Sequence, residues 1–332
     1  MASKRPQSPP ISLVELRKRC RDASLSEQEL TDYFLPDEEN SKPFAPALKL
    51  NEALVDVGRA RPGPDAISKL YADATRAQTP LPKKPRVLTQ TFRRAAKTKL
   101  LAEGDSWFNL PDYIYPKTAI DFLGSDNDFD VSNIALWGDE LEAMVRAKQY
   151  RQPLRSGLFG HFLFSGGGND VLGSIPAYVK PRKSGDTDPA HAADYVKATF
   201  PQKISQMMGF YRSLANDARD ATAGRVVLYV HGYANAIPKK GGHYLGGPFE
   251  TLGFDPVAHA PLCRAIVAQM VKLFNDALQS FAQSTAHVVY NDLRPAMTER
   301  DWYRDEIHPN ESGARKIARI FAESVRANTP GV

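Results

Sequence analysis

The sequence has few cysteines and no long apolar segment, and both shortages limit what the protein can be. Its 332 residues include two cysteines, Cys20 and Cys263, which lie far apart and belong to no Cys-x-x-Cys pair. Two cysteines this far apart predict neither a disulfide framework nor a thiolate zinc site. No stretch approaches the roughly 20 apolar residues that span a bilayer. The basic N-terminus precedes no apolar signal segment, so we expect a cytoplasmic protein unless a route without a signal peptide exports it.

Metal-binding spacings are missing as well. The seven histidines include no His-Glu-x-x-His or similar pair, and this spacing is what would mark a zinc site on a helix. We therefore expect no metal and no cofactor. For the histidines other than His308 we favour structural or surface roles, although His231 could line a pocket.

Positive charge is concentrated in the N-terminal third. Residues 1–100 hold 19 Lys and Arg against 12 Asp and Glu, so the rest of the chain carries −2 of the overall charge of +5. Residues 83–99 contain seven basic residues, no acid and one aromatic, Phe92. Nucleic-acid binders usually interleave more aromatics, so nucleic acid is disfavoured as a partner. We favour a solvated linker, with an anionic membrane surface or a partner protein as the alternatives.

The patterning divides the chain near residue 95. Residues 1–11 are rich in Pro, Ser and basic residues, which favours disorder. Ser26 followed by Glu29 resembles a capping box. We predict an N-terminal extension over 1–95, partly helical and partly disordered, followed by a second, larger domain over 96–332. The extension has three predicted helices and one stiff Pro-rich linker, over 26–34, 48–57, 65–77 and 79–86.

From residue 97 onward, short apolar runs alternate with longer helical patterns. This alternation predicts a parallel sheet covered by helices on both faces, with the chemistry at the carboxyl ends of the strands. Two long connections, 171–189 and 231–256, are of the length that is usually functional or disordered. The predicted strands cover 98–102, 129–137, 160–164, 225–230 and 286–290. The predicted helices cover 139–149, 190–220, 257–283 and 311–327.

Three short blocks follow the first three of these strands. Gly104-Asp105-Ser106 would hold the serine in a tight strand-to-helix turn, although a simple turn with an N-cap serine has the same pattern. A backbone N–H at Gly138 and the side-chain amide of Asn169 could each donate to an oxyanion. The glycines before Asn169 also fit a flexible turn with an Asx cap.

A fourth block, Asp305-Glu306-Ile307-His308-Pro309, precedes the last predicted helix. A carboxylate three residues before a histidine can accept the Nδ1 proton and leave Nε2 free to take a proton from serine. The alternative is a helix-start turn in which Asp305 caps the helix and His308 is solvated.

These four blocks, in this order, resemble the SGNH/GDSL hydrolase family over about residues 97–328. The resemblance implies a three-layer α/β/α flavodoxin-like fold with a five-stranded parallel sheet in the order 2-1-3-4-5. A mostly helical or extended N-terminal appendage would lie outside it. No Gly-x-Ser-x-Gly elbow surrounds Ser106, which argues against the α/β-hydrolase fold.

The resemblance also implies roles for individual residues. Ser106 would be the nucleophile, His308 the general base, and Asp305 the group that orients His308. The backbone N–H groups of Ser106 and Gly138, together with the Asn169 side chain, would form the oxyanion hole. The residue after the serine is Trp107, where the family often has leucine.

The predicted activity is hydrolysis of carboxylic esters, of the esterase or lipase type, through an acyl-enzyme. The substrate could be a lipid ester, an acetylated sugar or a thioester. One alternative is a non-catalytic binding protein on the same scaffold, which the intact motif residues disfavour. Another is an effector or adaptor that the N-terminal region docks to a partner or membrane.

A substrate pocket is predicted from the long second connection. Its aromatic residues either shape an apolar acyl or aryl pocket or pack the loop onto the domain, and the sequence favours neither. The predicted pocket residues are Asp105, Trp107, Gly168, Tyr233, Phe249, Phe254 and Trp302.

Overall fold

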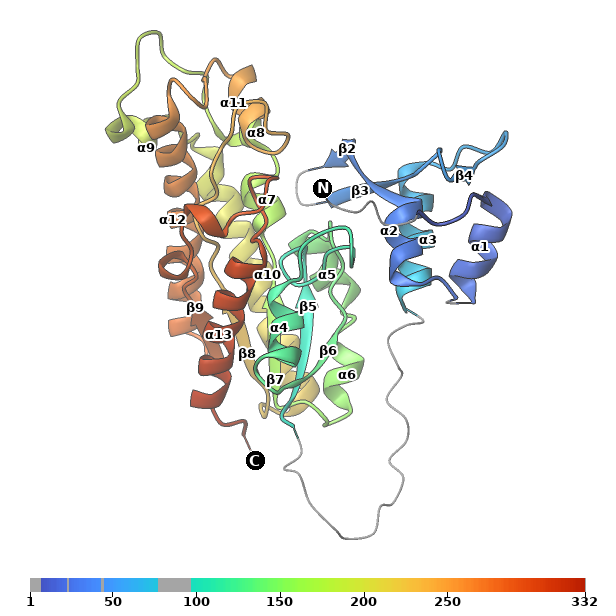
Figure 1. Ribbon diagram of the computed structural model, residues 1–332. Helices are drawn as coiled ribbons and strands as arrows, with labels where there is room; N and C mark the ends of the chain where they lie inside the picture. The colour runs from blue at the N-terminus through green and yellow to red at the C-terminus, as the bar shows by residue number, and fades with distance from the viewer. Residues whose placement is uncertain (1–6, 23, 43–44, 77–96, 332) are drawn as a thin grey trace. The chain divides into compact units, whose positions relative to one another are not determined.

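The computed structural model describes residues 7–22, 24–42, 45–76 and 97–331. The chain folds into two units (Figure 1). The main unit comprises Lys42–Ala45, Lys97–Leu110 and Lys117–Val332, and the N-terminal unit comprises Met1–Ser41, Pro46–Ala96 and Pro111–Pro116. The predicted linker over 79–86 and most of the basic run over 83–99 lie outside the described residues, as do residues 1–6 of the segment predicted to be disordered.

The main unit is built on a five-stranded sheet in which every neighbouring pair is parallel. The strand order β6-β5-β7-β8-β9 confirms the predicted order 2-1-3-4-5. The inner strands are almost continuously buried, as expected for a parallel sheet covered on both faces. The strands are β5 (Lys99–Gly104), β6 (Asp130–Asn133), β7 (His161–Ser165), β8 (Val227–His231) and β9 (Val288–Asn291).

The edge strand β6 is shorter than the predicted 129–137. The apolar run continues beyond it, and the N–H groups of Ile134 and Leu136 still donate to the carbonyls of Ala102 and Gly104, at 2.8 and 3.0 Å. The chain then turns at Gly138, whose φ of 85° is readily adopted only by glycine. The strand itself ends at Asn133, and the apolar run continues only through these two further hydrogen bonds before the turn.

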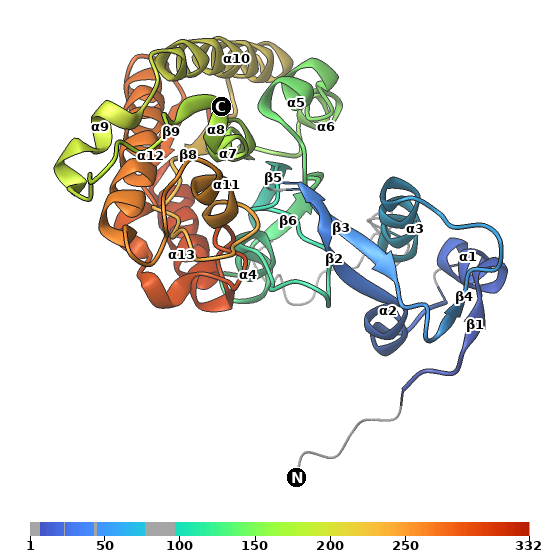
Figure 2. The same cartoon turned by 90° about the horizontal axis from the view of Figure 1, so that it is seen from above.

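Helices cover both faces of the sheet, so the unit has the predicted three layers (Figure 2). On one face α10 (Thr199–Thr222) packs against α5 (Leu141–Ala147) and α12 (Ala260–Gln283). On the other face α4 (Ala119–Ser125) packs against α13 (Glu311–Ala327). The shorter helices are α6 (Arg151–Arg155), α7 (Gly168–Leu172), α8 (Ile175–Tyr178), α9 (Ala192–Tyr195), α11 (Gly246–Thr251), η1 (Pro189–His191), η2 (Arg294–Ala296) and η3 (Glu299–Asp301).

The predicted helix over 190–220 begins later than expected. Its first part is occupied by the short η1 and α9, after which Val196 pairs with Val179 as an isolated bridge. Helix α10 starts only at Thr199. The predicted helices over 139–149, 257–283 and 311–327 correspond to α5, α12 and α13.

The N-terminal unit contains strands as well as helices. The predicted capping box is confirmed at the start of α2, where Glu29 N–H donates to Ser26 Oγ and Ser26 N–H donates to Glu29 Oε2. The predicted helix over 65–77 is confirmed as α3. The elements are α1 (Leu13–Arg21), α2 (Glu27–Tyr33), α3 (Pro64–Arg76), a β1 (Ile11–Ser12) and β4 (Val55–Asp56) pair, and a β2 (Phe34–Lys42) and β3 (Ala45–Leu50) pair.

The predicted helix over 48–57 is wrong. These residues belong to the end of β3, a turn, and β4. Leu48 and Leu50 are buried while Lys49 between them is exposed, which is the two-residue alternation of a strand. The segment is too short for that alternation to be distinguished from a helical pattern. No helix in the described parts of the chain is long and apolar enough to cross a membrane.

Candidate active site

Ser106 lies in a turn directly after the inner strand β5. A Cβ atom on Gly104 would lie 2.6 Å from the Cβ of Ser165, so only glycine lets the ends of β5 and β7 approach this closely. The N–H groups of Phe108 and Asn109 donate to the Asp105 carbonyl at 3.1 and 3.2 Å, which forms a single helical turn. The expected strand-to-helix turn is therefore wrong in one respect: the next helix, α4, begins only at Ala119. The proline at 111 disfavours helical backbone at the residue before it and accounts for the early stop.

Three side chains predicted to act together are in hydrogen-bonding contact. His308 Nε2 lies 2.7 Å from Ser106 Oγ, and His308 Nδ1 lies 2.7 Å from Asp305 Oδ2. The other oxygen of Asp305 accepts the backbone N–H of His308 at 3.1 Å. Ser106 and His308 are fully buried. Burial acts to raise the pKa of Asp305, but the neighbouring His308 and these hydrogen bonds outweigh it and hold the pKa below its ordinary value.

Residues 302–309, here called the triad loop, present Asp305 and His308. Trp302 and Pro309 form an antiparallel bridge at its base. Tyr303 N–H donates to the His308 carbonyl at 2.8 Å, which closes the loop on itself. Directly after the loop, the Asn310 side chain caps α13 by accepting the N–H of Gly313. The cap and the bridge fix both ends of the loop, so the alternative in which Asp305 caps the helix and His308 is solvated does not hold.

Two of the three predicted oxyanion donors are adjacent in the structure. Asn169 Nδ2 donates to the carbonyl of Asp139 at 2.7 Å, which joins the start of α7 to the turn at Gly138. Asn169 Oδ1 is buried and has no hydrogen-bond partner among the described residues. An amide nitrogen carries two hydrogens, so the bond to Asp139 orients the group while a second N–H remains to be donated.

Asp105 was predicted to line the substrate pocket, and this prediction is wrong. The residue is fully buried, and its carboxylate accepts from Ser165 Oγ at 2.7 Å and from the Tyr233 hydroxyl at 2.6 Å. It also accepts the backbone N–H of Trp107 at 3.1 Å. These three hydrogen bonds connect the turn that carries Ser106 to β7 and to the loop after β8, so the Asp105 carboxylate stabilises that turn.

Trp107 and Tyr233 belong to a buried aromatic cluster beside Ser106. The Trp107 ring stacks on His231 with centroids 5.8 Å apart and meets Tyr233 edge-on at 4.9 Å. Its Nε1–H donates to the carbonyl of Ile307 in the triad loop at 3.2 Å. Gly168 is buried against the same cluster, and a Cβ there would lie 2.9 Å from the Tyr233 ring. These three predicted pocket residues therefore pack against one another beneath the site and do not form the wall of an open pocket.

Phe249 and Phe254 pack the long loop onto the domain. Their rings meet each other at 5.3 Å, and Phe254 also meets Tyr195 at 5.3 Å. Both residues are buried. Of the two interpretations open from the sequence, loop packing accounts for this burial, so neither ring lines an open acyl pocket.

Trp302, another predicted pocket residue, lines a cavity. The cavity has a volume of about 560 Å³ and lies between the segment after β8, the start of α12 and the segment before the triad loop. The Trp302 ring is 6.1 Å from that of Trp107, the residue after Ser106. The lining mixes small or apolar side chains with polar ones. Besides Trp302, the apolar ones are Ala234, Ala236, Ile237, Ala265, Ala268 and Met297, and the polar ones are Asn235, Arg264, Arg294, Thr298 and Glu299.

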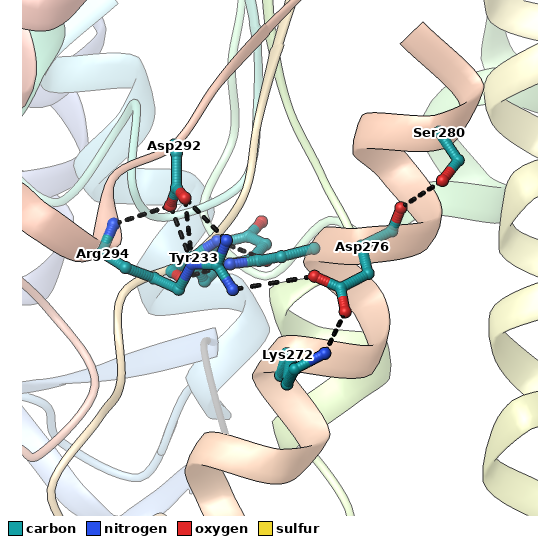
Figure 3. Close-up of polar contacts among 7 residues, drawn as sticks. Tyr233, Lys272, Asp276, Ser280, Asp292 and Arg294 are labelled. Carbon is teal, nitrogen blue, oxygen red and sulfur yellow. Dashed lines mark hydrogen bonds and ion pairs between the residues drawn. The ribbon is translucent and has the colours of Figure 1, made fainter. Parts of the chain in front are cut away.

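Both arginines of this cavity are already paired with carboxylates. Arg294 bonds Asp292 through Nε and Nη2 at 2.9 and 2.6 Å and lies 3.8 Å from Asp276, which in turn pairs with Lys272 (Figure 3). Arg264 pairs with Glu299. Since each cation is neutralised by a neighbour, the cavity offers no unpaired positive charge from these two residues to an anionic ligand.

Sequence reasoning missed three carboxyl groups within or next to the motifs. Glu103 is buried directly before Gly104, and burial, followed by the nearby charge of Asp139, raises its pKa to about 8. Asp139 follows Gly138, and burial together with Asp105 raises its pKa to about 6. An acid inside an otherwise apolar strand was the available signal for Glu103. The third missed group, Glu306, stands between Asp305 and His308, where no periodicity indicates the direction of its side chain.

No protein-family model matches the sequence, and no curated protein matches it. Among solved structures, the chain is similar to a lipase from a goat rumen metagenome, at 15% identity and a TM-score of 0.47, over 69% of this chain and 97% of that one. It is also similar to a carbohydrate esterase family 3 protein from Talaromyces cellulolyticus, at 16% identity and a TM-score of 0.41, over 69% and 97% of the two chains. A mutant of an acetylxylan esterase from Geobacillus stearothermophilus is similar at 13% identity and a TM-score of 0.42, over 69% and 94%. The strand order of the main unit is the one that the resemblance in the sequence implies. Likenesses at these identities carry no conclusion about activity or substrate.

Proposed function

We propose that the protein is a serine hydrolase that cleaves carboxylic esters through an acyl-enzyme on Ser106. The observation that carries the proposal is the continuous relay from Ser106 Oγ through His308 to Asp305, with both links at 2.7 Å. A serine hydroxyl is a weak nucleophile and needs an adjacent base, and the base needs a third group to orient it. Both requirements are met here, because Ser106 follows one strand end and the triad loop supplies His308 and Asp305.

Acylation begins when His308 Nε2 takes the proton of Ser106 Oγ as that oxygen attacks the ester carbonyl. Asp305 accepts a hydrogen bond from Nδ1–H, which fixes the tautomer and stabilises the imidazolium that forms. His308 then donates its new proton to the leaving alcohol as the carbon–oxygen bond breaks. The acyl group stays on Ser106, and in the second half His308 activates a water molecule that releases it as a carboxylic acid.

The developing oxyanion needs hydrogen-bond donors aimed at the oxygen of the tetrahedral intermediate. We assign the backbone N–H groups of Ser106 and Gly138 and the side-chain amide of Asn169 to this role. The bond from Asn169 to the Asp139 carbonyl supports the assignment, because it orients the amide before substrate arrives. Losing one such donor typically lowers kcat by about 10²–10³.

The cavity lined by Trp302 is our candidate for the acyl pocket. It lies beside the aromatic cluster next to Ser106, and its two arginines are paired with acids. A neutral acyl group fits such a lining better than a phosphate or a free carboxylate, because a second anion would have to displace an existing partner. We therefore infer that the substrate is an ester of a neutral, medium-sized acyl group.

The test is hydrolysis of a chain-length series of p-nitrophenyl esters by the wild type and by Ser106→Ala. We expect turnover by the wild type and a loss on the order of 10⁴ or more in kcat for the variant. Ser184→Ala, a change at an exposed serine, is the matched control and should match the wild type. A fluorophosphonate probe should label Ser106 in the wild type, and absence of both labelling and turnover would contradict the proposal.

A further inference from the structure

The carboxylate of Glu306 leaves the triad loop and enters a ring of backbone amides. It is fully buried. One oxygen accepts the N–H groups of Lys239 and Gly246, at 2.6 and 3.0 Å, and the other accepts those of Tyr244 and Leu245, at 3.0 and 2.9 Å. Four backbone donors on one carboxylate make a strong, directional attachment, because hydrogen bonds to an ionised acceptor are shorter and stronger than neutral ones.

The segment that supplies these donors, residues 239–246, is shaped around the carboxylate. A Cβ on Gly242 would collide with the Glu306 carboxyl group, and one on Gly246 would collide with the carbonyl of Lys239. The Lys239 side chain adds a second attachment, since its Nζ donates to the carbonyls of Tyr303 and Arg304 at 3.1 and 3.3 Å. The two loops therefore meet at the acid and at one lysine.

This attachment sits beside the reacting groups without being one of them. Glu306 stands between Asp305 and His308 in the loop. Its φ of 76° is a left-handed backbone conformation that residues other than glycine rarely adopt. Tyr244, whose N–H is bonded to Glu306, places its ring edge-on to the His308 ring at 6.4 Å. The same segment that holds Glu306 therefore packs against the catalytic imidazole.

We propose that Glu306 is a positioning residue that holds Asp305 and His308 in register with Ser106 by anchoring the triad loop to residues 239–246. The anchor acts only while residues 239–246 are ordered against His308, so the order of that segment and the reactivity of Ser106 are coupled. The kinetic side of this proposal rests on the proposed esterase function.

The test begins with Glu306→Gln, which keeps the shape but replaces one acceptor oxygen by a donor and leaves its two N–H partners without an acceptor. We expect kcat, expressed per site titrated with fluorophosphonate, to fall roughly 10- to 100-fold, because misplacing a catalytic group by about 1 Å costs on this scale. KM should stay near that of the wild type. Counting only titrated sites removes any loss that comes from unfolded protein.

Glu250→Gln is the matched control. Glu250 is exposed and accepts the N–H of Gly241 at 3.0 Å, so it bonds the same segment but not the triad loop. We expect its kcat and KM to match the wild type. An equal loss in both variants would mean that the segment tolerates no change at all, and it would overturn the specific role of Glu306.

A second route reaches the anchor from the other side. Gly242→Ala should displace the Glu306 carboxylate and reproduce the kcat loss with the triad loop unaltered in sequence. The double variant should be no slower than the slower single variant, because both changes remove the same attachment. Losses that multiply, or an unchanged Gly242→Ala enzyme, would overturn the proposal. Gly242→Ala also decides the question if Glu306→Gln does not fold.

Hydrogen exchange separates this proposal from the esterase function. In Glu306→Gln, backbone amides of residues 239–246 and of the triad loop should exchange faster, and in Glu250→Gln the triad loop should not change. If the wild type cleaves no ester, the esterase proposal fails while exchange still reports the anchor. If exchange in the triad loop is unchanged in Glu306→Gln, the anchor is wrong whatever the activity.

Discussion

Glu103 places a protonated acid directly behind the serine turn. The residue is 3% exposed, and its Oε2 has no hydrogen-bond partner within the described parts of the chain. Burial and the nearby Asp139 raise its pKa to about 8, although a backbone N–H of Tyr150 opposes the shift. At neutral pH the folded state therefore keeps this carboxyl group neutral, whereas the unfolded chain ionises it.

This difference makes stability depend on pH in a defined window. Because the folded pKa lies above the ordinary value of 4.5, the stabilising contribution is complete below about pH 4.5 and is lost as pH rises through about 8. Its full size is at most about 5 kcal/mol. Glu103→Gln should lose less stability than the wild type between pH 5 and 8.5, measured by denaturant unfolding followed through tryptophan fluorescence.

Glu323→Gln, a change at an exposed acid of α13, is the control for the loss of one negative charge. Its stability should follow the wild type across the same pH range. Parallel curves for Glu103→Gln and the wild type would show that Glu103 is not neutral in the fold.

At the scale of elements, the cavity beside Trp302 is bordered by one face of α12. Ala265 and Ala268 contribute to its lining, so a larger side chain there reduces the space available to an acyl group. Ala268→Phe should shift the p-nitrophenyl ester preference toward shorter chains, with activity on acetate esters largely kept. Gln279→Phe, at an exposed position of the same helix, should leave the profile unchanged, and an unshifted profile in Ala268→Phe would remove this cavity as the acyl pocket.

The elements of the sheet could be predicted from sequence because each buried strand is a short apolar run between glycines and helical patterns. The predictions of element type or bounds were wrong where tertiary packing, and not the local sequence pattern, determines the secondary structure. The segment over 48–57 has too few residues for its period to be distinguished, and only pairing in the structure makes it part of two strands. The start of α10 depends on the bridge between Val179 and Val196, which no local signal indicates.

The triad candidates could be named because their spacing encodes their chemistry. Asp305 three residues before His308 is a local pattern, and the structure brings both to Ser106. The pocket could not be named in this way. Phe249 and Phe254 pack against each other, and Asp105 binds three donors from beneath the turn. Side chains from distant segments decide whether an aromatic faces a cavity or a core, and a single sequence does not record that choice.

At the scale of the whole molecule, each unit contains one buried cysteine. Cys20 belongs to the N-terminal unit and Cys263 to α12 of the main unit, and burial raises the pKa of each thiol to about 12. Both thiols should therefore resist alkylation in the native protein. The smaller unit buries less apolar surface and should open first, so with increasing urea Cys20 should be labelled before Cys263.

The measurement is pulsed alkylation followed by peptide mass spectrometry. Tryptophan fluorescence provides an independent reading of the main unit, because Trp107, Trp137 and Trp302 all belong to it. Simultaneous labelling of both cysteines, coincident with the fluorescence change, would show that the two units unfold as one.

The collision between a side chain at 242 and the carboxylate at 306 has a consequence for the history of the sequence. A lineage that shortens the acid at 306 relieves the demand for glycine at 242, whereas a lineage that keeps the acid cannot accept a bulkier residue there. Substitutions at these two sites, more than 60 positions apart, should therefore accumulate together. Homologues that keep both the acid at 306 and the glycine at 242 would hold the histidine loop in this way, and homologues that have lost both would hold it by other contacts.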